Sequence, residues 1–337
     1  MHHESGQIVR RFRLKVCVVG AGAIGGWLGV KLAKAGHAVS VLARGATLAA
    51  VQQNGLQLIE GDATLHAAVT ASANAADFAT PDLLIIAVKA PGLRAAALSV
   101  KSLIGPNTLV LTAMNGVPWW FFDRVDRPLN GTRLTTIDAS GDIAASIPAG
   151  NVMGCVVHAA CSVDAPGVIR HKMGQRLIIG EPRGGASLRL TALHETLLAA
   201  GFESEPSTDI QCEVWFKLWG NMTMNPVSAL TGATTDKILD DPLVREFCSN
   251  VMREAQVIGG KIGIPIEQTP EQRHAVTRKL GAMRTSMLQD VEANKGIELD
   301  ALVAAVAEIG QKVSVPTPYT DALLGLTRLM ARGRGLY

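Results

Sequence analysis

The sequence predicts an α/β protein in which a Rossmann-type, doubly wound parallel sheet is followed by an all-helical part. Continuous apolar runs at residues 83–88 and 108–113 are typical of buried parallel strands, and helical patterns lie between them. After residue 206 only helical patterns remain. The 337 residues suffice for two domains, which we expect at residues 1–207 and 208–337.

The first predicted strand, residues 15–19, leads directly into a glycine-rich turn and an amphipathic helix. The turn consists of Gly20, Ala21, Gly22, Ala23, Ile24 and Gly25. Glycines also serve ordinary turns and helix caps, but this context favours a dinucleotide-binding turn. Backbone N–H groups at the start of the helix would then face a pyrophosphate.

The second predicted strand, residues 38–43, bears on which dinucleotide binds. In NAD enzymes an acidic residue near this point binds the ribose hydroxyl, whereas here the strand is followed by Arg44. A guanidinium suits the 2′-phosphate of NADP, although Arg44 could instead be a solvated surface residue. The position favours NADP as the cofactor.

The remaining elements follow from periodicity and turn signals. In the first half we expect further strands at 64–70, 156–163, 167–170, 176–180 and 202–205, and helices at 47–53, 92–103 and 188–200. The strands at 156–163, 167–170 and 176–180 are expected to be antiparallel. In the second half we expect helices at 210–230, 242–262, 270–292, 299–313 and 318–332. Three of them begin at a cap residue followed by proline, namely Asp241, Thr269 and Thr317.

Composition and charge indicate which partners and which location to expect for the protein. The net charge of +3 and the lack of a basic run with interleaved aromatics do not indicate a nucleic-acid partner. No run reaches the roughly 18 apolar residues needed to cross a bilayer. Five cysteines form no paired framework, which favours reduced thiols and a cytoplasmic location. Cys155, His158 and Cys161 do not predict a metal site, because on a strand His158 faces away from the two cysteines.

Polar residues follow two of the predicted parallel strands. Lys89 comes after residues 83–88, and Asn115 with Gly116 comes after residues 108–113. Ligands of open α/β sheets bind beyond the carboxyl ends of the strands, so both are candidates for a cofactor cleft. Taken singly, Lys89 could begin a solvated loop and Asn115-Gly116 could be only a turn.

A second set of candidates lies on the very apolar helix at residues 210–230. Lys217, Asn221 and Asn225 are spaced by four residues and therefore share one face. A polar stripe on a buried helix needs partners, and a substrate cleft would supply them. The stripe could also face water or another helix. Farther on, Ser286 and Glu298 could be an ordinary helical serine and a helix-capping acid.

Taken together, these motifs resemble those of the ketopantoate reductase (2-dehydropantoate 2-reductase) family. The resemblance runs from Gly20 to about Pro316. It is carried in order by Gly-x-Gly-Ala-Ile-Gly-Gly at 20–26, Ala-Val-Lys at 87–89, Asn-Gly-Val at 115–117, Trp-x-Lys-Leu at 215–218 with Asn221 and Asn225-Pro226, Ser-Met-Leu-Gln-Asp at 286–290 and Glu-x-Asp at 298–300.

The resemblance implies NADPH-dependent reduction of a 2-oxo acid to a 2-hydroxy acid, foremost 2-dehydropantoate to pantoate in pantothenate biosynthesis. Lys217 would be the general acid, and Glu298 would orient Lys217 or the substrate. Asn221, Asn225 and Ser286 would bind the substrate, and Lys89 and Asn115 would lie near the nicotinamide, ribose and substrate.

Three departures from the family pattern concern the substrate. Many relatives have Asn-Gly where this chain has Val303-Ala304. Many also have Asn at the position of Met283, and often Thr at the position of Ile297. The alternatives are a related reductase acting on another 2-oxo acid or an opine-type substrate, and a non-catalytic NADPH-binding regulatory module. The sequence leaves open whether the chain forms a homodimer.

Overall fold

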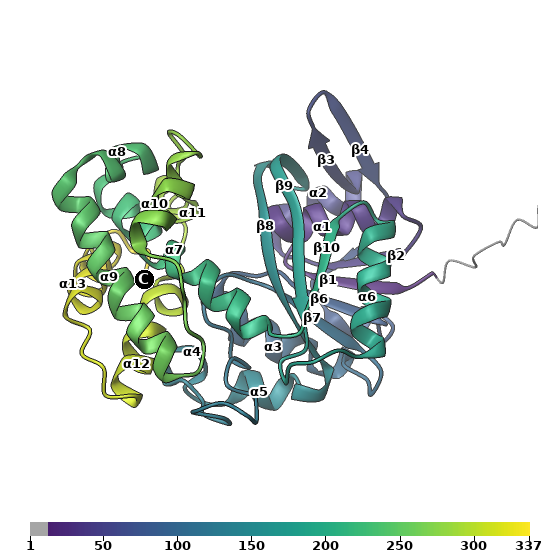
Figure 1. The fold of residues 1–337 in the computed structure, drawn as a ribbon. Helices are drawn as coiled ribbons and strands as arrows, with labels where there is room; N and C mark the ends of the chain where they lie inside the picture. The colour runs from purple at the N-terminus through teal and green to yellow at the C-terminus, as the bar shows by residue number, and fades with distance from the viewer. Residues whose placement is uncertain (1–12) are drawn as a thin grey trace, which may run out of the picture.

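A computed structural model describes residues 13–337 (Figure 1). Ten strands form one sheet in the order β4-β3-β9-β8-β7-β6-β1-β2-β5, with β10 pairing β9. The strands are β1 (Lys15–Val19), β2 (Ala38–Leu42), β3 (Leu56–Glu60), β4 (Ala63–Ala67), β5 (Thr70–Ser72), β6 (Leu83–Ile86), β7 (Leu109–Ala113), β8 (Val152–Ala165), β9 (Val168–Gly180) and β10 (Glu203–Ser207). Strands β7, β6, β1, β2 and β5 run parallel, so their carboxyl ends share one edge, as the buried apolar runs predict.

Helices cover both faces of the sheet and form the second half of the chain (Figure 1). They are α1 (Ala23–Lys34), α2 (Gly45–Asn54), α3 (Leu93–Val100), α4 (Thr135–Asp138), α5 (Asp142–Ser146), α6 (Leu188–Ala199), α7 (Ile210–Thr231), α8 (Thr235–Asp240), α9 (Pro242–Lys261), α10 (Pro270–Arg278), α11 (Ser286–Glu292), α12 (Ala305–Lys312) and α13 (Pro318–Gly333). A π-helical turn, Asp300–Ala304, leads into α12. No helix of the described part of the chain combines the length and apolarity needed to cross a bilayer.

Several expectations for the sheet half were wrong in detail. The single strand expected at 64–70 is divided between β4, which runs antiparallel to β3, and β5, which pairs with β2. Strand β3 was not predicted. The strands expected at 167–170 and 176–180 are one strand, β9, because pairing with the long β8 holds the polar residues between them in the sheet. Short apolar runs do not reveal such long-range pairing.

In the helical half the helix expected at 270–292 is interrupted. Helix α10 ends at Arg278, Gly281 adopts a φ of +62°, and the Thr285 side chain accepts a hydrogen bond from Leu288 N–H to begin α11. The caps predicted at Asp241 and Thr269 are confirmed, the latter as a capping box. Thr317 makes no capping bond, because its hydroxyl instead hydrogen-bonds Asp321.

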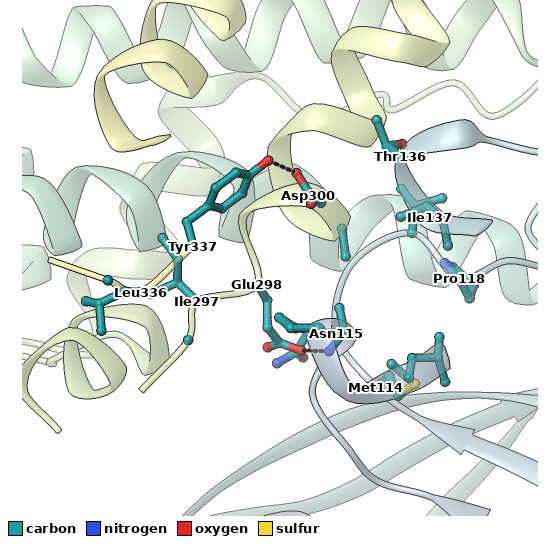
Figure 2. Close-up of a pocket in the computed structure, with 17 residues that line it drawn as sticks. Met114, Asn115, Pro118, Thr136, Ile137, Ile297, Glu298, Asp300, Leu336 and Tyr337 are labelled. Carbon is teal, nitrogen blue, oxygen red and sulfur yellow. Dashed lines mark hydrogen bonds between the residues drawn. The ribbon is translucent and has the colours of Figure 1, made fainter. Parts of the chain in front are cut away.

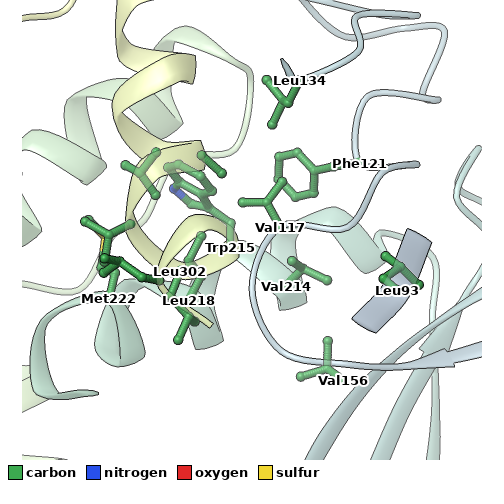
Figure 3. Packing of buried hydrophobic residues seen from close by; sticks show 14 of the residues in the cluster. Leu93, Val117, Phe121, Leu134, Val156, Val214, Trp215, Leu218, Met222 and Leu302 are labelled. Atoms are coloured by element: carbon green, nitrogen blue, oxygen red, sulfur yellow. The ribbon is translucent and has the colours of Figure 1, made fainter. Parts of the chain in front are cut away.

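The apolar core is continuous between the sheet and the C-terminal helices (Figure 3). Val156 of β8, Val117 after β7 and Leu93 of α3 belong to the same buried cluster as Trp215 of α7 and Leu302 of the π-helical turn. Burial of this apolar surface stabilises the position of α7 against the sheet. The domain boundary near residue 207, between β10 and α7, stays a prediction.

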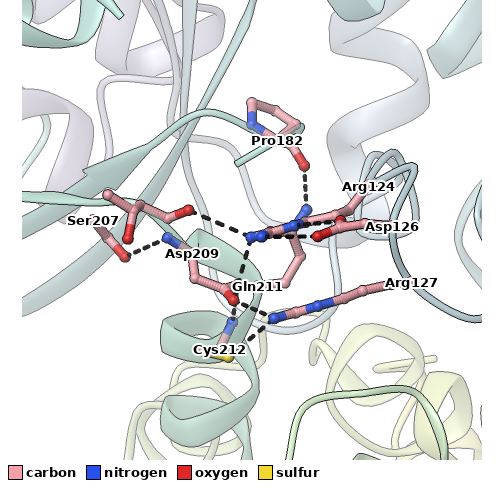
Figure 4. A network of polar contacts seen from close by, with 9 residues as sticks. Arg124, Asp126, Arg127, Pro182, Ser207, Asp209, Gln211 and Cys212 are labelled. Atoms are coloured by element: carbon pink, nitrogen blue, oxygen red, sulfur yellow. Dashed lines mark hydrogen bonds and ion pairs between the residues drawn. The ribbon is translucent and has the colours of Figure 1, made fainter. Parts of the chain in front are cut away.

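Ion pairs and a cap fix the start of α7 (Figure 4). The Asp209 carboxylate accepts a hydrogen bond from Cys212 N–H at 3.3 Å and pairs with Arg124 at 3.2 Å and with Arg127. Gln211, which is fully buried, donates from its amide to the Pro182 carbonyl. These contacts tie the helix that carries Lys217 to the loops beside the sheet.

We expect Asp209→Ala to lower the free energy of unfolding by about 2 kcal/mol, since it removes a helix cap and the carboxylate that pairs with the partly buried Arg127, whereas Arg124 keeps Asp126. Denaturant unfolding followed by circular dichroism measures this. Asp126→Ala removes a 63 % exposed carboxylate from the same network and should lower the free energy of unfolding far less, because solvent screens an exposed pair. Equal losses in the two variants would contradict the anchoring role of Asp209.

Candidate active site

The glycine-rich turn joins β1 to α1 at the carboxyl edge of the sheet. Gly20 adopts a φ of +93°, and its N–H donates to the Leu42 carbonyl of β2 at 3.2 Å. Nothing lies within 4 Å of the position that a Cβ on Gly22 would take. No acidic side chain occupies the first turn of α1, and no side chain caps it. Open space, free N–H groups and the positive helix end fit an anionic group such as a pyrophosphate.

Arg44 lies at the same edge. It follows β2, whose Leu42 is in register with Val19 of β1, next to the glycine turn. Its side chain is exposed and forms no ion pair within residues 13–337. Arg44 therefore stands where a ribose phosphate would lie if the pyrophosphate binds at the glycine turn.

The loop after β7 contacts the C-terminal helices at close range. Gly116 adopts a φ of +80°, and a Cβ there would lie 2.6 Å from both the Cβ and the carbonyl oxygen of Ala301. Val117 N–H donates to the Ala301 carbonyl at 2.8 Å. Asn115-Gly116 is therefore more than a turn, because it docks the sheet onto the π-helical segment and fixes the position of Asn115.

Lys217 meets this loop from α7. Its Nζ donates to Asn115 Oδ1 at 2.8 Å and to the Val157 carbonyl at 2.6 Å. The second acceptor is available because β8 continues beyond Cys155, the last residue that pairs with β7. The ammonium thus lies at the carboxyl edge of the sheet and shares the face of α7 with Asn221 and Asn225.

Burial lowers the pKa of Lys217 to about 8 from an ordinary value of 10.5. The Cys155 and Glu298 side chains act in the opposite direction. A lysine with this pKa is protonated at neutral pH and gives up its proton more readily than a surface lysine.

Glu298 is buried, with 8 % of its surface exposed, on the segment before the π-helical turn. Its Oε1 accepts a hydrogen bond from Ala90 N–H at 3.1 Å, so the carboxylate reaches across to the loop after β6 and does not cap its own helix. Burial raises the pKa of Glu298, while the Ala90 N–H, the charge of Lys89 and the Asn115 amide lower it.

A cavity of about 480 Å³ lies beside these residues (Figure 2). Asn115 and Glu298 form part of its wall, and most of the other lining side chains are apolar. Tyr337 donates to Asp300 at 2.7 Å on the far side of the cavity. Lys217 is not one of its lining residues, so the cavity extends from the Asn115–Glu298 side of the site.

The other predicted site residues form two further links. Lys89 pairs with Asp290 of α11, so its charge is not simply solvated. Asn225 of α7 donates to Ser286 of α11 at 3.3 Å. Asn221 is half-buried and makes no hydrogen bond from its side chain within the described residues.

Some participants carry no signal in the sequence. The Val157 carbonyl and the Ala90 N–H are backbone groups, so only the folded arrangement reveals them. Two of the residues that depart from the family pattern lie in different surroundings. Ile297 lines the cavity, whereas Val303 is completely buried in the core. Of the two, only Ile297 is placed to contact a ligand in the cavity.

The lowered pKa of Lys217 predicts a pH-dependent stability. From about pH 8 to 10.5 the unfolded chain binds more protons at this residue than the folded chain, so wild-type stability rises with pH in that window. Lys217→Met lacks this contribution. The unfolding free energy of the wild type minus that of the variant should therefore increase between pH 7.5 and 10, measured by urea unfolding without cofactor. A difference that stays constant would contradict the depressed pKa.

Comparisons with known proteins agree with this arrangement. The family described as Ketopantoate reductase PanE/ApbA matches residues 16–184, and its C-terminal counterpart matches residues 209–331. A 2-dehydropantoate 2-reductase from Mesorhizobium japonicum is 45 % identical over 96 % of this chain and 100 % of its own. The crystal structure of a candidate ketopantoate reductase from Ralstonia solanacearum MolK2 is 57 % identical, with a TM-score of 0.93 over 96 % of this chain and 99 % of that one. A PanE/ApbA family ketopantoate reductase from Ralstonia eutropha JMP134 is 25 % identical, with a TM-score of 0.82 over 95 % and 99 %. The chain belongs to the ketopantoate reductase family.

Proposed function

We propose that the protein reduces a 2-oxo acid to a 2-hydroxy acid with NADPH, with 2-dehydropantoate as the foremost substrate and pantoate as its product. The observation that carries the proposal is the way in which the Lys217 ammonium is hydrogen-bonded. A buried ammonium has three donors, and Asn115 and Val157 accept from two of them. Within residues 13–337 the third donor has no acceptor, so it can donate to a ketone oxygen.

Lys217 acts as the general acid in this proposal. Its charge stabilises the negative charge that develops on the ketone oxygen, and its proton then neutralises the alkoxide. A pKa of about 8 suits this task, because the group is protonated at neutral pH and is a stronger acid than an ordinary lysine. Bound NADPH supplies the hydride that reduces the ketone carbon.

Glu298 and Asn115 position the acid. Asn115 holds Lys217 by a direct hydrogen bond, and the carboxylate of Glu298 acts on Lys217 through its charge. The Ala90 N–H fixes the Glu298 carboxylate in turn. Because Glu298 is buried, its charge is screened little by solvent and favours the protonated form of Lys217.

The remaining polar residues divide between substrate and cofactor. Asn221, Asn225 and Ser286 lie on α7 and α11 and would bind the hydroxyl and carboxylate oxygens of the substrate. The glycine turn would hold the pyrophosphate of NADPH, Arg44 its 2′-phosphate, and Lys89 and Asn115 would lie near its nicotinamide end.

Two alternatives are kept. The apolar Ile297 on the cavity wall favours a 2-oxo acid other than 2-dehydropantoate, because an apolar side chain cannot form a hydrogen bond with a substrate hydroxyl. A non-catalytic NADPH-binding module would not need a buried lysine with a free donor, so the arrangement of Lys217 argues against it.

We expect the wild type to oxidise NADPH with at least one member of a panel of branched and unbranched 2-oxo acids that includes 2-dehydropantoate. Lys217→Ala should lower kcat by about 10²- to 10⁴-fold, the usual contribution of a positioned acid, and leave NADPH binding intact. Steady-state absorbance at 340 nm and fluorescence titration measure the two effects. Lys261→Ala, which removes an exposed lysine, is the control. A wild type inactive on the whole panel, or a Lys217→Ala variant with unchanged kcat, would refute the proposal.

Arg44→Ala should weaken NADPH binding by about 10- to 100-fold, since hydrogen bonds to a charged group contribute about 1.5–3 kcal/mol. NADH lacks the 2′-phosphate and should bind the variant and the wild type alike. Titration of both coenzymes by protein fluorescence measures the ratio. Equal weakening for the two coenzymes would remove Arg44 from phosphate recognition.

A further inference from the structure

A half-buried arginine lies against α7, beside Phe216 and Gly220. The guanidinium carbon of Arg273, on α10, is 4.9 Å from the centre of the Phe216 ring. A Cβ on Gly220 would come within 2.9 Å of Arg273 Nε, so the glycine makes room for this side chain. Arg273 Nε is buried and has no hydrogen-bond partner among the described residues.

Arg273 also lacks a counter-ion. Among residues 13–337 its guanidinium forms no ion pair and donates no hydrogen bond, whereas Arg278 on the same helix pairs with Asp240 at 2.6 Å. Burial lowers the pKa of Arg273, but an arginine keeps its charge at neutral pH. A partly desolvated charge without a partner is costly, and a bound anion would compensate that cost.

The position of Arg273 borders the proposed reaction centre. Gly220 follows Lys217 by three residues and directly precedes Asn221, so Arg273 lies beside the polar stripe of α7. Across from it, His158 follows the Val157 that accepts from Lys217. The pKa of His158 is lowered to about 4, first by burial and then by the charges of Lys217, Arg176 and Arg273.

Three cations and one carboxylate, Glu205, therefore act on His158, so positive charge predominates around it. Of the cations that act on His158, Arg176 pairs with Glu205 at 2.6 Å, while Arg273 has no such partner in the described chain. The phosphate-binding candidates lie in the sheet half, the glycine turn where β1 leads into α1 and Arg44 between β2 and α2. Arg273 belongs to the wall that carries the proposed substrate residues.

We propose that Arg273 binds the carboxylate of the substrate and so determines specificity for 2-oxo acids over neutral ketones; this rests on the proposed function. A planar guanidinium binds a carboxylate through two parallel N–H···O bonds. The ketone oxygen of the same molecule would then meet the free donor of Lys217. Arg273 is thus an addition to the substrate residues implied by the family pattern.

The test uses a 2-oxo acid that the wild type reduces and compares it with the methyl ester of the same acid. The ester presents the same ketone without the negative charge. For Arg273→Met, kcat/KM for the acid should fall by about 10- to 100-fold, mostly through KM, while kcat/KM for the ester should change less than about threefold. Lys279→Met removes one positive charge from the exposed end of α10 and should leave the acid-to-ester ratio at its wild-type value. Arg273→Lys should recover only part of the loss, because an ammonium cannot form the bidentate pair.

The outcomes separate the two proposals. A wild type that reduces no 2-oxo acid refutes the proposed function. A wild type that reduces the acid, together with an Arg273→Met variant whose acid-to-ester ratio is unchanged, refutes the role of Arg273 alone. Equal losses for acid and ester would show a structural role and also overturn it. If Arg273→Met fails to fold, the acid-to-ester ratio of Arg273→Lys decides, with an unchanged ratio counting against the proposal.

Discussion

The contact between the loop after β7 and the π-helical turn Asp300–Ala304 determines the geometry of the whole site. Val117 N–H binds the Ala301 carbonyl, and Gly116 allows the two backbones to approach. Asn115 is thereby held where Lys217 reaches it from α7. π-Helical turns are rare in proteins overall, and those that occur often lie at functional sites. Here it supplies the surface on which a sheet edge and a helix bundle meet, and side chains from both halves complete one constellation.

Each charged residue of this site belongs to one half of the chain and is held by groups of the other half. Lys217 of the helical half is held by acceptors of the sheet half, and Glu298 of the helical half is held by Ala90 N–H of the sheet half. Burial shifts the pKa of the lysine down and that of the carboxyl group up, so each is closer to neutrality than on a surface. The charge of Glu298 raises the pKa of Lys217 in return, and at about 8 the lysine is protonated at neutral pH.

The sequence predicts the elements whose signals are local. The turn at Gly20, the buried runs of β6 and β7, and the polar stripe from Lys217 each depend on neighbouring residues only, and so does the capping box at Thr269. Features that depend on distant pairing escaped prediction. Strand β9 is continuous because β8 pairs with it, and the Val157 carbonyl is a site component only because β8 extends beyond β7. The roles proposed for the site residues come from the resemblance to the family, and no single periodicity indicates them.

The end of the chain is part of the same structure. The Leu336 carbonyl accepts a hydrogen bond from Ile297 N–H, and Tyr337 binds Asp300, so the last residues hold both flanks of Glu298. Leu336 and Tyr337 also line the cavity. An affinity tag fused directly after Tyr337 would therefore pull on the backbone beside a buried carboxylate. For kinetic work a tag belongs at the other end of the chain, or behind a flexible linker long enough to leave these two bonds undisturbed.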